Sequence, residues 1–192
     1  EVARALERQL KDKNKLVRKA ALEALAAMPG DRDLGLICSL LADPELEVQA
    51  RAVDLVVKLR HPDTMKHLVN VLKDESEFVR RGAVEVLNQG GPTVRDAVLQ
   101  LVGDKDENIR RSAIEILNQT KDERAVDYLI KATRDNDWWV RERAADALAE
   151  IRSEKAAPAL LEMLTGDARS VPAALRALGR LGSSEVLPRL LP

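Results

Sequence analysis

The most constraining feature of this sequence is a short segment that recurs about every 31 residues along the chain. The segment is clearest at the pair Val140-Arg141, and we call its first residue the anchor. Counterparts of the pair begin at Val17, Val48, Val79, Ile109 and Val171. Self-similarity at one fixed period of this size is typical of a helical-repeat array, in which each unit packs only on its neighbours. The period therefore predicts stacked units rather than a domain with one central core.

Within each period the apolar spacing predicts two helices, of which the second begins just before the anchor. Val79, Ala83, Val86 and Leu87 lie at offsets of 0, 4, 7 and 8, which is one face of a helix. The fourth residue after the anchor is alanine in five of six units, with Leu175 as the exception, and this predicts close approach of a neighbouring helix. The expected helices are 2–11, 14–27, 32–42, 45–59, 63–73, 76–89, 93–103, 106–119, 123–133, 137–151, 155–165, 168–181 and 184–191.

Both ends of the chain predict that it is a single array, residues 1–192, cut from a longer protein. The sequence starts at Glu1 rather than at methionine, already inside a helical pattern. At the other end Val186, Leu187, Leu190 and Leu191 form an apolar stripe with no helix after it. A continuation of the array, a cap or self-association through this helix would cover the stripe.

Composition excludes several classes of function. Lysine and arginine number 31 against 32 acidic residues, for a net charge of -1, which argues against a general nucleic-acid binder. The single cysteine excludes an internal disulfide framework and fits a reducing compartment, so we expect a cytoplasmic protein. No apolar run reaches the roughly 18 residues that a membrane span requires.

Four decapeptides carry a resemblance to a known family: LVRKAALEAL (16–25), FVRRGAVEVL (78–87), NIRRSAIEIL (108–117) and WVRERAADAL (139–148). They resemble HEAT repeats, of the short kind named after phycobilisome lyases, and the resemblance covers essentially the whole chain. It implies an all-α, right-handed α-solenoid of about six helix pairs plus a C-terminal helix. In such a fold the anchor helices line a concave face.

Two charged patterns repeat with the anchors. An arginine follows the anchor and an aspartate lies five residues before it; we expect the arginine to bind the aspartate of the adjoining repeat, although an anion-binding ladder is the alternative. Gln49 and Pro172 interrupt the arginines, so their repeats should open first. The second pattern lies on the exposed side of the anchor helices and predicts solvated pairs within a helix, with a mixed-charge recognition strip as the alternative. Its pairs are Lys19/Glu23, Arg81/Glu85, Arg111/Glu115, Arg51/Asp54 and Arg143/Asp146.

The four aromatic residues, Phe78, Tyr128, Trp138 and Trp139, are the most informative side chains for function. Phe78 and Trp139 stand immediately before their anchors, and other repeats hold charged residues at these places. We therefore expect at least one tryptophan to be exposed at the rim. It either covers the neighbouring loop or anchors a partner. A repeat spacing of about 10 Å would put Phe78 and the tryptophans about 20 Å apart along one edge.

Residues suited to catalysis or metal binding are few. Cys38 shares its column with aliphatic residues and is expected in the core. His61 and His67 have no third ligand nearby, and no nucleophile has an evident base. We expect no catalytic residue, no metal and no cofactor.

The sequence thus predicts a non-enzymatic scaffold that binds a protein partner through the concave face and the aromatic rim. A subunit of a lyase-type enzyme that binds a tetrapyrrole-like ligand in the groove is one alternative, and a HEAT-like nucleic-acid-binding module is another. The expected partner-binding residues are Phe78, Arg81, Arg111, Trp138, Trp139, Glu142 and Arg143.

Overall fold

The computed structural model describes residues 1–89 and 92–182, and all regular structure in these ranges is helical. The chain divides into two compact units, which we call unit 1 (Glu1–Arg95) and unit 2 (Asp96–Pro192). Each unit is built from helix pairs, as the period predicts, and the all-α prediction is confirmed.

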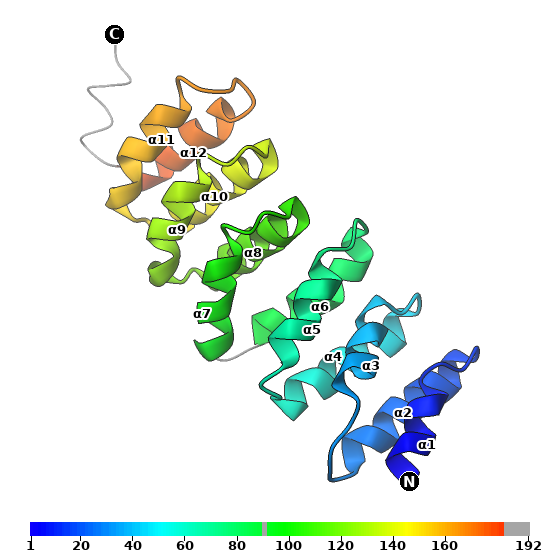
Figure 1. Cartoon of the computed structure of the whole chain (residues 1–192). Coiled ribbons are helices and arrows are strands. Elements are labelled where there is room, and N and C mark those ends of the chain that lie inside the picture. Colours follow the sequence, from blue (N-terminus) through cyan, green and yellow to red (C-terminus); the bar gives the residue numbers. More distant parts are fainter. Residues whose placement is uncertain (90–91, 183–192) are drawn as a thin grey trace. The chain divides into compact units, whose positions relative to one another are not determined.

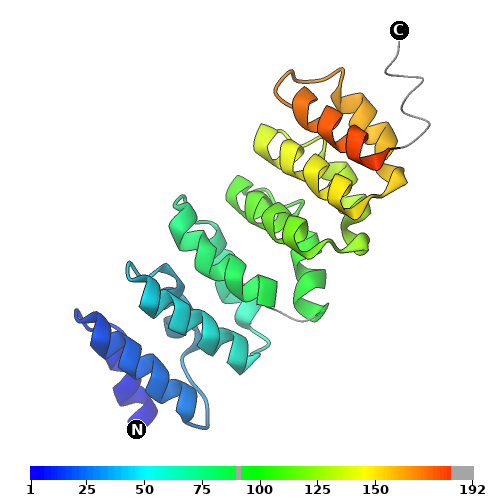
Figure 2. The same ribbon diagram turned by 180° about the vertical axis from the view of Figure 1, so that it is seen from behind.

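In unit 1 the second helices of successive pairs pack side by side in one layer, and the first helices form a second layer (Figure 1, Figure 2). The second helices are α2 (Lys15–Ala27), α4 (Leu46–Leu59) and α6 (Glu77–Gln89). The first helices are α1 (Val2–Gln9), α3 (Leu34–Ser39), which continues into the 3-10 turn η1 (Leu40–Ala42), and α5 (Thr64–Leu72).

Unit 2 repeats the arrangement, with α10 (Trp138–Ile151) packed between α8 (Glu107–Thr120) and α12 (Val171–Leu181) (Figure 2). The helices of the other layer are α7 (Pro92–Leu101), which crosses the boundary between the units, α9 (Val126–Ala132) and α11 (Ala157–Met163). The 3-10 turns η2 (Glu123–Ala125) and η3 (Glu154–Ala156) precede α9 and α11.

Polar side chains cap the N-termini of several second helices. Asn14, Asp106 and Asp137 each accept a hydrogen bond from the backbone amide two residues later, which satisfies one of the free N–H groups of the first turn. Three of these helices end in a left-handed residue that is not glycine: Arg60, Lys121 and Arg152. Gly182 ends α12 in the same conformation.

The alanine column consists of the alanines that lie four residues after the anchors. Ala21, Ala52, Ala83, Ala113 and Ala144 are all buried, as expected for positions where neighbouring helices approach closely. The anchors Val48, Ile109 and Val140 are fully buried as well, whereas Val17 and Val79 are half-buried. The predicted core face of these helices is therefore confirmed.

The predicted register of the last pair is wrong by one residue. Ser170 and Ala174 are buried at 2% and 0% exposure, whereas Leu175 is 48% exposed. The anchor place thus belongs to Ser170 rather than Val171, and Ala174 takes the alanine place that Leu175 appeared to break. The reason is that the Ser170 amide donates to the Asp167 carbonyl at 2.8 Å in a tight turn, and Pro172 then enters the first helical turn, where no N–H is required.

The first helices of the pairs are shorter than predicted, and in three pairs part of the predicted helix is a 3-10 turn instead: η1 after α3, η2 before α9 and η3 before α11. The expected helix 184–191 and its apolar stripe lie outside the described residues. Among the helices of residues 1–89 and 92–182, none is long and apolar enough to span a bilayer.

Candidate interaction surface

An arginine in unit 1 joins two successive repeats through a buried ion pair. Arg18 of α2 donates from Nε and Nη2 to the two carboxylate oxygens of Asp43, at 2.7 and 2.8 Å. Its Nη1 donates to the carbonyl of Asp12 at 2.9 Å, within its own repeat. The hydrogen bond to Asp43 raises the pKa of Arg18 above its ordinary value. The arginine therefore holds the loop that precedes α4.

Unit 2 repeats this clamp. Arg110 donates to both carboxylate oxygens of Asp135, at 2.8 and 3.0 Å. Arg141 binds Asp167 and also donates to the Ser170 hydroxyl at 2.9 Å. Each of these aspartates also accepts from the amide two residues later, which fixes the turn. The structural interpretation is confirmed for Arg18, Arg110 and Arg141, which bind an aspartate of the adjoining repeat. Arg80 instead donates to backbone carbonyls of its own repeat.

Gln49 replaces the clamp by neutral hydrogen bonds. Its buried side chain donates to the carbonyl of Leu41 at 2.6 Å and to that of Phe78 at 3.2 Å. Asp74, which occupies the place of Asp43 one repeat later, is exposed. The contact between α4 and α6 thus lacks the charge-assisted pair found between α2 and α4.

The exposed charges pair mainly between neighbouring helices, which differs from the predicted pairing within one helix. Lys19 binds Glu47 at 2.8 Å rather than Glu23, and Glu23 binds Arg51 at 3.2 Å. Two predicted pairs do lie within a helix, at the longer distances of 3.6 Å for Arg51–Asp54 and 4.0 Å for Arg143–Asp146. Sequence spacing predicted which residues share a helix face, but the offset between adjacent helices decides which charges meet.

The tryptophans form the first turn of α10. Trp138 is 41% exposed and Trp139 is half-buried, so the prediction that at least one is exposed is confirmed. The guanidinium of Arg143, one turn later, lies over the Trp139 ring at 5.4 Å from its centroid. The residue before them, Asp137, is fixed by Arg111 at 2.5 Å and by the Trp139 amide. The indoles therefore stand on a well-defined helix start.

The pKa of the Asp137 carboxyl, next to the tryptophans, is set by opposing influences. Burial by itself would raise the pKa of Asp137, but the hydrogen bonds from Arg111 and from the Trp139 amide outweigh it. The pKa of the carboxyl consequently lies below its ordinary value. This charge keeps Arg111 oriented toward the helix start.

Unit 1 has exposed apolar residues at the same first-turn positions. Phe78 is 37% exposed, as expected from the sequence. Leu16 and Leu46 are 63% and 58% exposed, although neither is among the predicted partner-binding residues. Their columns were visible in the alignment of repeats, because Leu16 lies in the column of Phe78 and Leu46 in that of Trp138.

The predicted partner-binding residues fall on both units. Phe78 and the exposed Arg81 belong to α6 of unit 1. The other five lie on neighbouring helices of unit 2, where Arg111 and Glu142 are already engaged, Glu142 by Arg176 at 2.9 Å. Of these five residues, Trp138 and Arg143 have exposed side chains. The expected spacing between Phe78 and the tryptophans stays a prediction.

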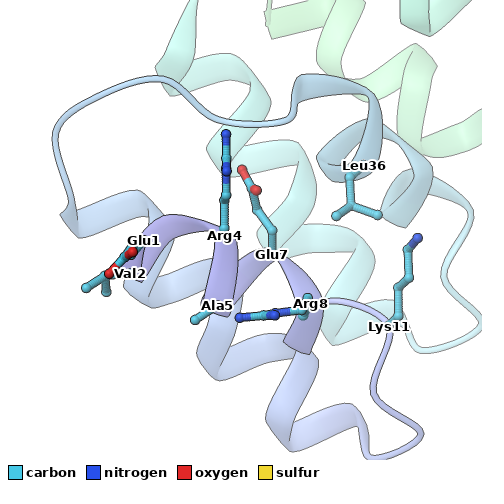
Figure 3. A pocket seen from close by; sticks show the side chains of 8 residues that line it. All are labelled: Glu1, Val2, Arg4, Ala5, Glu7, Arg8, Lys11 and Leu36. Carbon is cyan, nitrogen blue, oxygen red and sulfur yellow. The ribbon is translucent and has the colours of Figure 1, made fainter.

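The described residues show little that suits catalysis. A wide pocket of about 870 Å³ opens between α1 and α3 and is lined mainly by charged side chains of the first repeat (Figure 3). One of them, Glu7, accepts a hydrogen bond from the Asp33 amide at 2.7 Å. Cys38 is buried, and burial raises the pKa of its thiol to about 11, which keeps it protonated and unreactive. Within residues 1–89 and 92–182 no three His, Cys, Asp or Glu side chains are grouped to hold a metal ion.

Comparison with family models identifies the repeats. A model of HEAT repeats matches residues 34–100 and 94–172, and a model of the PBS lyase HEAT-like repeat matches residues 173–192. No curated protein sequence matches the chain.

Solved structures share the fold at low sequence identity. A structure titled for crescerin and its TOG domain array is 17% identical, with a TM-score of 0.60, over 93% of this chain and 89% of that chain. The complex of CpcE and CpcF of phycocyanin lyase from Nostoc sp. PCC7120 is 19% identical, with a TM-score of 0.52, over 75% of this chain and 96% of that chain. At these identities the likeness concerns the fold alone.

Proposed function

The chain belongs to the HEAT-repeat family, and from this premise we propose that it is a non-enzymatic scaffold that binds a protein partner. The partner-binding residues are the first-turn side chains Phe78, Trp138 and Trp139, supported by Arg81, Arg111, Glu142 and Arg143. The exposure of Trp138 carries the proposal. Large aromatic side chains and arginine are the residues that most often dominate binding energy at protein interfaces.

The surroundings of the tryptophans support a binding role because they are ordered in advance. Asp137 caps α10 and binds Arg111, and Arg143 is stacked on Trp139. The clamp from Arg110 to Asp135 fixes the preceding turn. A surface that is already rigid loses less conformational freedom when a partner binds, and more of the contact energy appears as affinity.

The non-enzymatic part of the proposal has its own support and its own test. The only cysteine is a buried, protonated thiol, and the wide pocket at α1 and α3 lacks a paired nucleophile and base among its lining residues. Addition of a bilin to the purified chain should leave the absorption spectrum of the pigment unchanged. A red shift with saturable binding would contradict a purely protein-binding role.

The direct experiment removes the two indoles. Capture of proteins by the immobilised chain should be lost in the Trp138→Ala/Trp139→Ala variant, while its melting temperature changes little. The matched control is Val2→Ala/Leu16→Ala, which removes two exposed apolar side chains from unit 1. Equal capture by both variants would contradict the proposal. A cooperative loss of helix in the tryptophan variant would show that the indoles are structural cover instead.

A further inference from the structure

We infer, resting on the proposed function, that the start of α10 binds an acidic segment of the partner, with carboxylates placed around an apolar side chain. The surface consists of Trp138, Trp139, Arg143 and Arg169, and we call it the tryptophan–arginine patch. The exposed indole supplies the apolar contact, and the two arginines supply the charge. All four residues belong to unit 2.

Arg143 contributes an exposed cation beside Trp139. Its guanidinium carbon lies 5.4 Å from the centroid of the Trp139 ring, which is a cation–π contact. Its carboxylate partner among the described residues is Asp146, at 4.0 Å, which is too long for a hydrogen bond. Asp146 also lies 3.5 Å from Arg176, so it is shared between two cations. The charge of Arg143 is therefore only weakly compensated.

Arg169 places a second cation beside the same helix start. Its neighbour Ser170 accepts a hydrogen bond from Arg141, which lies two residues after Trp139. The Arg169 amide donates to Asp167, the residue that Arg141 also binds, so the backbone is fixed against the first turn of α10. The side chain of Arg169 is exposed and makes no ion pair with any residue that the structure describes.

The carboxylates of this edge are already engaged. Asp135 is bound by Arg110, Asp137 by Arg111 and Asp167 by Arg141. They consequently contribute little free negative charge, whereas the side chains of Arg143 and Arg169 are exposed. Complementary charge at such a surface favours an anionic partner.

The arrangement fits a protein segment better than a nucleic acid. Two arginines of α12 are bound by carboxylates, Arg176 by Glu142 and Arg180 by Glu150. A phosphate backbone is bound by a continuous row of unpaired cations, because each contact releases a counterion. Two exposed arginines near the start of α10, together with the exposed indole of Trp138, match a short acidic segment with one apolar residue.

The test uses two synthetic peptides and the chain's own fluorescence. Trp138 and Trp139 are its only tryptophans, so a change in emission reports directly on the patch. One peptide carries glutamates around a central leucine, and the other replaces every glutamate by glutamine. The glutamate peptide should bind at least about tenfold more tightly at low salt, which is about 1.4 kcal/mol. This advantage should fall as salt screens the charges.

Charge-removal variants make the test specific. Arg143→Gln/Arg169→Gln should abolish the preference for the glutamate peptide, whereas Arg4→Gln/Arg8→Gln, which removes two exposed charges from α1, should retain it. Equal binding of the two peptides, binding of neither, or tighter binding of a DNA oligonucleotide would each overturn the inference. The proposed function is tested separately. It fails if the Trp138→Ala/Trp139→Ala variant still captures its partner.

Discussion

At the scale of single residues, Gly82 shows how closely the repeats approach in unit 1. A β-carbon at Gly82 would lie 2.6 Å from the Leu41 carbonyl oxygen and 3.0 Å from the Leu41 β-carbon. Leu41 is fully buried in η1, and its carbonyl also accepts from Gln49, so this backbone has little room to move. The absence of a side chain at Gly82 is therefore required for α6 to pack on η1.

We accordingly predict that Gly82→Ala destabilises unit 1 by about 1–3 kcal/mol, because overpacking outweighs the better helix propensity of alanine. The free energy of unfolding in urea measures the effect. Gly179→Ala is the matched control, since a β-carbon there meets nothing within 4 Å and α12 should be unchanged or slightly more stable. A Gly82→Ala variant as stable as the original chain would show that η1 yields readily.

At the same scale, the sequence predicted the burial of residues and the Arg–Asp pairs better than it predicted which exposed charges pair. The Arg–Asp pairs between repeats, the exposed tryptophan and the buried Cys38 were all predicted, because each follows from a repeated column or from burial. The partners of Lys19 and Glu23 were predicted wrongly, because pairing across helices depends on how far one helix is displaced along the next. That displacement is a property of packing and leaves no mark on the spacing within one repeat.

At the scale of elements, three of the second helices end in a strained backbone conformation that a substitution can relieve. Arg60, Lys121 and Arg152 adopt positive φ values of 47, 49 and 58°, where a β-carbon is unfavourable. The same place after α12 holds Gly182, with φ of 61°. Glycine is the residue that this helix ending favours.

We therefore predict that Arg152→Gly raises the free energy of unfolding of unit 2 by about 1 kcal/mol. Arg152→Ala is the control, because it removes the same charge but keeps the β-carbon, and it should give no such gain. Thermal and urea unfolding of the two variants distinguish the effects. Equal stability of both would mean that the left-handed cap is not under strain.

The elements themselves were largely predictable, with two exceptions that have physical causes. In three pairs a 3-10 turn replaces part of the first helix: η1 follows α3, and η2 and η3 precede α9 and α11. Over so few residues these turns have the same apolar spacing as an α-helical turn. The last register was predicted one residue late because Val171 resembles an anchor. The turn from Asp167 to Ser170 and the proline at the helix start place Ser170 there instead.

At the scale of the whole molecule, stability passes from each repeat to the next through the clamps, and these are unequal. The bidentate pairs Arg18–Asp43 and Arg110–Asp135 join their repeats by charge-assisted hydrogen bonds. The contact from α4 to α6 has the neutral donor Gln49 instead. A stack of this kind opens first where its contacts between neighbours are weakest.

Native-state hydrogen exchange of the intact chain tests this account most directly, because it reads the opening of each helix separately. The amides of α6 should exchange faster than those of α10, which the clamps of Arg110 and Arg141 join to both of its neighbours, with the difference persisting at low denaturant, where local opening dominates. Equal protection of α6 and α10, or faster exchange in α10, would contradict the claim that the arginine clamps hold the repeats together.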